Sequence, residues 1–172
     1  GYGICHQIIP ESGSVLPGSL VIGADSHTCT YGALNVFSTG IGSTELAAAV
    51  TTGKMWFKVP KTVKVNIVGE LSPCVYSKDI ILNIIKYFKS DGMNYKAVEF
   101  QGEGIENLSM DARFTISNMA VEMGAKAGLM LFDNKTEEWL RNKAKKEIKP
   151  VYPDKDALYE RTVEFDISKI EP

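Results

Sequence analysis

Strand-like and helix-like patterns alternate along most of this chain, and this alternation constrains the fold more than any other feature. Short runs of apolar and β-branched residues predict strands at residues 3–9, 20–23, 62–68, 97–100, 129–132 and 161–167. Helical spacing and capping residues predict helices at residues 45–52, 78–91, 110–123 and 136–148. The glycines within residues 28–44 predict a closely packed loop region there. The predicted fold class is therefore α/β.

The segment around Pro60 is the best candidate for a domain boundary. Residues 56–61 have the pattern of a linker, and strand-like alternation starts directly after them. A length of 172 residues suits one domain or parts of two. We therefore expect residues 1–60 to belong to a first α/β subdomain and residues 61–172 to a second. Because the chain begins without methionine, we also expect it to be an internal segment of a longer protein.

The composition argues against several classes of protein. A net charge of −2 gives no electrostatic support for binding to nucleic acid or to an anionic membrane. No apolar run approaches the roughly 18 residues that a membrane-spanning helix needs. The three cysteines, Cys5, Cys29 and Cys74, are odd in number and widely spaced, which argues against a disulfide framework. We therefore expect a cytoplasmic protein that binds neither nucleic acid nor membranes.

The only two histidines, His6 and His27, each lie in a dense polar motif. The pKa of histidine lies nearest neutral pH, so it is the usual proton carrier of an enzyme site. Asp25 and Ser26 directly precede His27, just after the predicted strand 20–23. Open α/β sheets present their chemistry at such strand ends, so the motif indicates an enzyme.

Asp25 has two candidate roles. A carboxylate that bonds one imidazole nitrogen fixes the tautomer and raises the basicity of the other nitrogen. Neighbours in sequence rarely pair in this way, so His6 is a better partner for Asp25 than His27 is. In the alternative, Asp25 and Ser26 cap a turn and His27 is structural, and spacing alone favours neither role.

Asn118 and Glu122 form a second candidate group. They are four residues apart in a predicted helix, hence on one face. The surrounding stretch is largely apolar, where an unpaired carboxylate is costly. His27 is the obvious partner for Glu122. The helix pattern alone, however, favours a solvent-facing stripe.

Two further sites receive less support. Cys5, His6, His27 and Cys29 could bind zinc, but adjacent residues of a strand point to opposite faces, which keeps Cys5 and His6 from sharing one metal ion. The glycine-rich run at residues 40–45 precedes a helix and could bind an anion. It lacks a complete nucleotide-binding motif, so we expect its glycines to serve close packing.

Several longer motifs occur here in the order found in one known family. In chain order they are Gly3-Ile4-Cys5-His6-Gln7, Gly23-Ala24-Asp25-Ser26-His27-Thr28, Gly40-Ile41-Gly42-Ser43-Thr44-Glu45, Lys78-Asp79-Ile80-Ile81-Leu82 and Asn118-Met119-Ala120-Val121-Glu122-Met123-Gly124-Ala125. The chain resembles the aconitase superfamily, and within it the large subunits of the isopropylmalate dehydratase and homoaconitase type. The resemblance implies part of a three-layer α/β/α fold and a 4Fe–4S hydro-lyase. Such enzymes interconvert hydroxy-acid isomers through an alkene, with one cluster iron acting as Lewis acid.

The resemblance also implies roles for individual residues. Four would be catalytic, in two carboxylate–imidazole pairs: His6 with Asp25, and His27 with Glu122. Ser26 would contact the substrate, and Asn118 would lie beside the cluster.

The family's cluster cysteines have no counterpart in this chain, so we expect no metal ligands here and no cluster bound by this segment alone. The resemblance further implies a small subunit that carries a swivelling domain, and a di- or tricarboxylic hydroxy acid as substrate. It favours isopropylmalate dehydration in leucine biosynthesis, with homoaconitase and methylmalate-type dehydratases as alternatives. A non-catalytic relative that binds RNA or metal is an alternative of another class, against which the acidic composition argues.

Overall fold

The computed structural model describes residues 3–171, which contain two parallel β-sheets. The smaller sheet pairs β1 (Leu20–Gly23) with β2 (Phe37–Gly40). The larger has the order β5-β4-β3-β6, from β3 (Lys61–Val68), β4 (Lys96–Gln101), β5 (Ala127–Met130) and β6 (Arg161–Asp166). The helices are α1 (Cys5–Glu11), α2 (Ser43–Thr52), α3 (Ser77–Phe88), α4 (Glu103–Glu106), α5 (Met110–Met119) and α6 (Asn134–Leu140), with 3-10 helices η1 (Ser26–Leu34), η2 (Ala120–Met123) and η3 (Ile167–Lys169). The predicted α/β class is confirmed.

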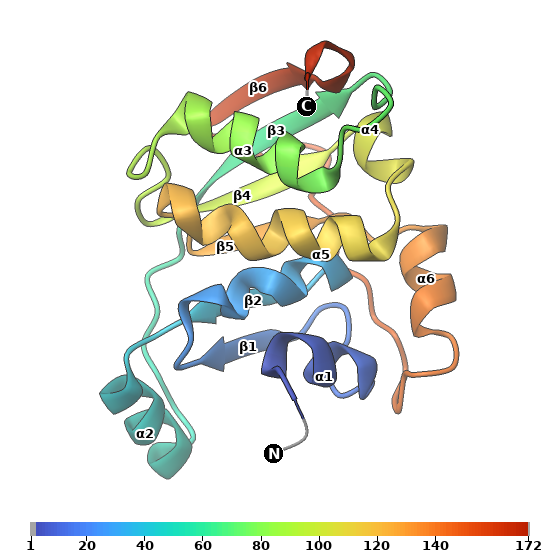
Figure 1. The fold of residues 1–172 in the computed structure, drawn as a ribbon. Coiled ribbons are helices and arrows are strands. Elements are labelled where there is room, and N and C mark those ends of the chain that lie inside the picture. Colours follow the sequence, from blue (N-terminus) through green and yellow to red (C-terminus); the bar gives the residue numbers. More distant parts are fainter. Residues whose placement is uncertain (1–2, 172) are drawn as a thin grey trace.

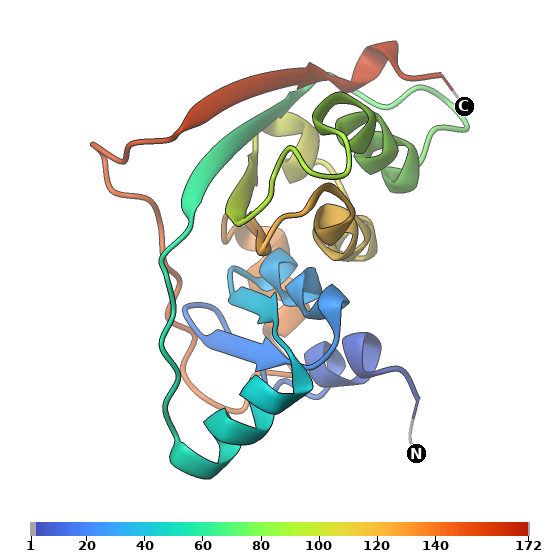
Figure 2. The ribbon, with the colours of Figure 1, turned by 90° about the vertical axis from the view of Figure 1, so that its left-hand side faces the viewer.

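The larger sheet buries one face. In β3 the alternate residues Val63, Val65 and Ile67 are buried, and the residues between them are not. The views in Figures 1 and 2 show α3 and α5 together on one side of this sheet. Burial of the apolar face against these helices removes apolar surface from water, which is the main force that stabilises the layer. The described residues thus supply one helical layer of the expected three-layer arrangement.

The strongly periodic segments are where the sequence predicted best. Helix α3 buries four apolar side chains at helical spacing: Ile80, Ile81, Ile84 and Phe88. It begins where the backbone N–H of Tyr76 donates to Asp79 Oδ2 at 2.8 Å, and it ends at Lys89, whose φ is +65°. Strand β1 has the predicted bounds, and α2 ends at Gly53 as expected.

The predicted strand at residues 3–9 is wrong, because the chain forms helix α1 there. The carbonyl of Ile4 accepts from the backbone N–H groups of both Gln7 and Ile8, which closes the first turn. Pro10 lies inside this helix and cannot donate the i→i−4 hydrogen bond, and the helix ends one residue later, at Glu11. The periodicity of a short apolar run does not distinguish a strand from a helix, which explains the error.

Other differences concern elements that tertiary contacts define. Residues 28–44 form most of η1, all of β2 and the start of α2 rather than a loop. The predicted helix 110–123 is α5 followed by the separate turn η2, and α6 ends at Leu140, well before residue 148. Strand β5 begins two residues before the predicted strand at 129–132, and α4 was not predicted. None of the helices within residues 3–171 is long and apolar enough to cross a membrane.

A second apolar cluster joins segments from both sides of Pro60. Val15, Leu34 and Val36 pack there with Met110 and Leu140. The division at Pro60 into two subdomains therefore stays a prediction, since this core draws on residues before and after the boundary.

Helix η1 fits against β5 with almost no space between the two backbones. Every residue of η1 from Thr28 to Leu34 is buried. A β-carbon on Gly32 would lie 1.9 Å from the carbonyl oxygen of Gly128 in β5, far inside van der Waals contact. Glycine at this position lets the two halves of the chain approach closely.

We therefore expect Gly32→Ala to lower the free energy of unfolding by about 3 kcal/mol, because a backbone atom blocks the added methyl and no rotamer can relieve the clash. Urea unfolding followed by circular dichroism measures the effect. Gly53→Ala is the control, since a β-carbon there meets nothing within 4 Å and only the left-handed φ of +68° opposes it, at about 1 kcal/mol. Equal losses in the two variants would contradict the close contact.

Candidate active site

The candidate site begins where β1 ends and η1 starts. Asp25 is the N-cap of η1, and its Oδ1 accepts the backbone N–H of His27 at 2.7 Å. This bond satisfies a free amide of the first turn and fixes the direction of the Asp25 carboxylate. A β-carbon on Gly40 would lie 2.7 Å from the Asp25 carbonyl oxygen and 2.8 Å from Ser26 Cα. The loop therefore rests directly on the end of β2.

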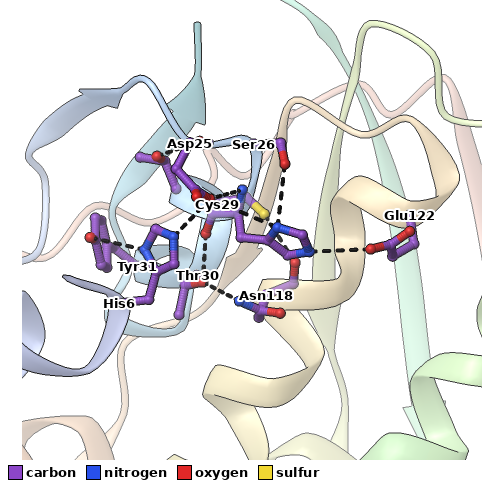
Figure 3. Close-up of polar contacts among 10 residues, drawn as sticks. His6, Asp25, Ser26, Cys29, Thr30, Tyr31, Asn118 and Glu122 are labelled. Atoms are coloured by element: carbon purple, nitrogen blue, oxygen red, sulfur yellow. Dashed lines mark hydrogen bonds and ion pairs between the residues drawn. The ribbon is translucent and has the colours of Figure 1, made fainter. Parts of the chain in front are cut away.

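His6 and Asp25 form the first carboxylate–imidazole pair (Figure 3). Helix α1 places His6 Nε2 2.9 Å from Asp25 Oδ1. Because a carboxylate only accepts hydrogen bonds, Nε2 carries the shared proton, and Nδ1 can then accept the hydroxyl of Tyr31 at 3.1 Å. The structure thus brings together the two residues that the sequence suggested, although a helix and not a strand delivers His6.

The contact between Tyr31 and His6 was not predicted from the sequence. Tyr31 lies in η1 and is almost fully buried, and burial raises the pKa of its hydroxyl to about 12. The hydroxyl therefore stays protonated at neutral pH and can donate to His6. No spacing rule singles out Tyr31, because its partner comes from a helix 25 residues away in sequence.

Hydrogen bonds hold the pKa of Asp25 below its ordinary value of 3.8. The bond from His6 contributes most, followed by the backbone N–H of His27, and the slight burial of the carboxyl opposes them. A carboxylate that receives such donors is stabilised in its charged form. Because folding lowers this pKa, the ionised group stabilises the fold above pH 3.8, and this stabilisation is lost as the pH falls through the lower folded value.

His27 and Glu122 form the second pair. His27 Nε2 lies 3.2 Å from Glu122 Oε1, and His27 Nδ1 lies 3.3 Å from Ser26 Oγ. Glu122 is contributed by η2, so the sequence argument that put Asn118 and Glu122 on one face of a continuous helix is wrong. The expectation that Glu122 finds a partner in His27 nevertheless agrees with this contact.

Asn118 faces η1 instead of open solvent. Its side-chain Nδ2 donates to Thr30 Oγ1 at 2.8 Å. Its backbone carbonyl oxygen accepts a hydrogen bond from the Cys29 thiol at 3.3 Å. Thr30 Oγ1 in turn donates to the carbonyl oxygen of His27 at 2.6 Å. This chain of bonds connects α5 to the backbone of His27 (Figure 3).

The imidazoles are more enclosed than their carboxylates. The side chains of His6 and His27 are 13% and 35% exposed, whereas those of Asp25 and Glu122 are 56% and 52% exposed. Each carboxylate therefore has an oxygen available to an incoming molecule while the imidazole behind it is held in place. A carboxylate held by an imidazole in this way can pass a proton to or from a bound ligand.

The cysteines of this chain do not provide a metal centre. Cys5 and Cys74 are exposed, and Cys29 is buried, which raises the pKa of its thiol to about 12 and disfavours the thiolate that a metal requires. Between Gly3 and Glu171 no group of three or more His, Cys, Asp or Glu side chains is arranged to hold a metal ion. The zinc site considered from the sequence therefore receives no support from the described residues.

One family model and several known proteins match this chain over nearly its whole length. A model of the aconitase family (aconitate hydratase) matches residues 1–172. The chain is 56% identical over 170 residues to the 3-isopropylmalate dehydratase large subunit of Halothermothrix orenii, and 55% identical over 172 residues to that of Wolinella succinogenes. It is 53% identical over 170 residues to large subunit 1 of this enzyme in Pyrococcus furiosus. These alignments cover 99% of this chain but only 40–41% of each relative, so the chain spans about two fifths of their length.

The geometry predicts how Asp25 titrates. In His6→Ala the pKa of Asp25 should rise toward 3.8, because its strongest hydrogen-bond donor is lost while the backbone N–H of His27 remains. NMR titration of carboxyl ¹³C labels measures this shift. Tyr31→Phe is the matched control, since it removes only the bond to the other ring nitrogen and should change the pKa less. An unchanged Asp25 pKa in His6→Ala would contradict the first pair.

Proposed function

Because the chain belongs to the aconitase family, we propose that it forms part of the large subunit of a hydro-lyase, and that the complete protein is a 3-isopropylmalate dehydratase of leucine biosynthesis. The names of the relatives, at 53–56% identity over nearly the whole chain, support this choice. Homoaconitase and methylmalate-type dehydratases are the alternatives within the same reaction class.

The observation that carries the proposal is the placement of two carboxylate–imidazole pairs on either side of Ser26. His6 with Asp25 and His27 with Glu122 come from three segments, α1, the start of η1 and η2, and meet at one strand end. Proton transfer in both directions is what a dehydration followed by a rehydration requires.

Dehydration removes a proton from the carbon beside a carboxylate and a hydroxyl from the adjacent carbon, leaving an alkene and water. The departing hydroxyl needs a proton, and rehydration returns water to the other carbon. We assign Glu122, with His27 behind it and Ser26 at the other nitrogen of His27, to contact with the substrate. We assign the more enclosed His6 to holding Asp25, whose second oxygen faces outward.

A 4Fe–4S cluster belongs to the proposal for the complete protein, because the aconitase family implies one. The cysteines of this chain do not fit its ligand set, since one is buried as a thiol and none joins a metal-binding group within the described residues. Asn118 is the residue that we assign to the cluster's surroundings. The roles proposed for the two pairs do not depend on any contact with the cluster.

The proposal also names partners. The relatives are large subunits, so we propose a small subunit that carries the swivelling domain, and a di- or tricarboxylic hydroxy acid as substrate. We further propose that residues 1–60 and 61–172 belong to two subdomains of the large subunit and that the enzyme acts in the cytoplasm.

Removal of either pair should abolish most turnover. In the full-length large subunit assembled with its small subunit, we expect His6→Ala, Asp25→Asn and Glu122→Gln each to lower kcat about 100-fold or more, because a positioned proton carrier is lost. The absorbance of the iron–sulfur cluster should remain. A steady-state assay of alkene formation measures kcat, and the visible spectrum measures the cluster.

The control is Glu99→Gln, which changes a carboxylate bonded to Tyr159 on the larger sheet, away from the site. It should leave kcat within about twofold. If cluster absorbance and activity fall together in the variants of the pairs, these residues are structural and the proposed roles are wrong.

Residues 1–172 alone should bind no iron–sulfur cluster, because their cysteines do not form its ligand set. Anaerobic reconstitution with iron and sulfide, followed by gel filtration and a visible spectrum, tests this. An iron–sulfur absorption band that coelutes with the chain would contradict the expectation.

A further inference from the structure

We propose that Lys126 supplies the cation that binds one carboxylate of the substrate beside Ser26, an inference that rests on the proposed function because it concerns the same hydroxy acid. A substrate of this class carries at least two negative charges near neutral pH. The site already presents the carboxylates of Asp25 and Glu122, both about half exposed. A dianion therefore needs a cation nearby to offset this repulsion.

A hollow of about 390 Å³ opens beside the two pairs. The Ser26 loop lines one part of it, residues 39–42 at the end of β2 line another, and the segment from Gly124 to Lys126 lines a third. Ser26 also contacts His27, and Val121 in the lining directly precedes Glu122. The hollow thus adjoins the reacting groups and has the size of a small-molecule site.

The charge of the lining favours an anion. Lys126 is the one charged side chain among the described residues that line this hollow. A second hollow, of about 480 Å³ beside His6, is lined by the carboxylates of Glu11 and Asp111. Its lysine, Lys143, already donates to the carbonyl oxygen of Trp139 at 2.9 Å. A carboxylate would be repelled there and attracted at Lys126.

Lys126 is held in place without a carboxylate partner. Its backbone N–H donates to the carbonyl oxygen of Lys96 at 2.8 Å, and its Nζ lies 5.2 Å from the centroid of the Tyr95 ring. Lys58 Nζ lies 5.7 Å from the same ring. Within residues 3–171 neither lysine forms an ion pair with a carboxylate. Two cations without a carboxylate partner therefore lie over the same ring, and one of them, Lys126, lines the hollow.

A bound carboxylate would receive charge-assisted hydrogen bonds from the Lys126 ammonium and a hydroxyl bond from Ser26. The other end of the substrate would then lie toward His27 and Glu122. Lys126 follows Glu122 by only four residues, so the ligand and the proton carrier are positioned by one short segment. The subsite would orient the substrate and select for the second carboxylate.

The test uses the full-length large subunit with its small subunit and cluster. We expect Lys126→Gln to raise KM for the hydroxy diacid about tenfold while kcat stays within about twofold, because ground state and transition state lose the same ionic contact. Calorimetric titration with malate, a hydroxy dicarboxylate, should show a similar loss of affinity. Lys126→Arg keeps the charge and should restore KM to within about threefold of the native value.

Lys64→Gln is the matched control, since Lys64 also lies over a tyrosine ring, 5.6 Å from the centroid of Tyr159, but lines neither hollow. An unchanged KM in Lys126→Gln, or an equal rise in Lys64→Gln, would overturn the subsite. A structural defect would lower kcat and cluster content at constant KM, and that result would also overturn it. A native enzyme that neither dehydrates hydroxy acids nor binds malate would contradict the proposed function itself.

Discussion

The burial of η1 between the two halves of the chain is the constraint on which the site depends. Its residues from Thr28 onward are inaccessible, and Gly32 touches the backbone of β5 so closely that only glycine is accommodated. The same short helix begins at Asp25 and contains His27 and Tyr31. Its position therefore determines where one carboxylate, one imidazole and one phenol lie. A shift of η1 would disturb all the polar contacts at once.

Much of the fold follows from sequence wherever a pattern is long and periodic. Helix α3 and strand β3 have clear apolar periods, and both occur close to their predicted bounds. Two of the errors fall where a segment is short. Strand β2 includes Ser38 and Thr39 and is a strand only because it pairs with β1. Helix α1 combines apolar residues and a proline in a single short run, which periodicity cannot assign.

The site was more predictable than the local structure that builds it. The basicity that a bonded carboxylate gives an imidazole suggested His6 as the partner of Asp25. The cost of an unpaired carboxylate in a largely apolar stretch suggested His27 as the partner of Glu122. The pairs therefore agree with expectation even though His6 lies on a helix and Glu122 on η2. Tyr31 and Lys126 could not be found in this way. Their significance arises from the space around them, which a linear pattern does not encode.

The two pairs differ in the distance that separates their members along the chain. His6 and Asp25 are 19 residues apart, whereas His27 and Glu122 are 95 residues apart. Closing the longer loop costs more conformational entropy and must await the docking of distant segments. Proton chemistry that needs both pairs is therefore complete only once the distant segments have docked.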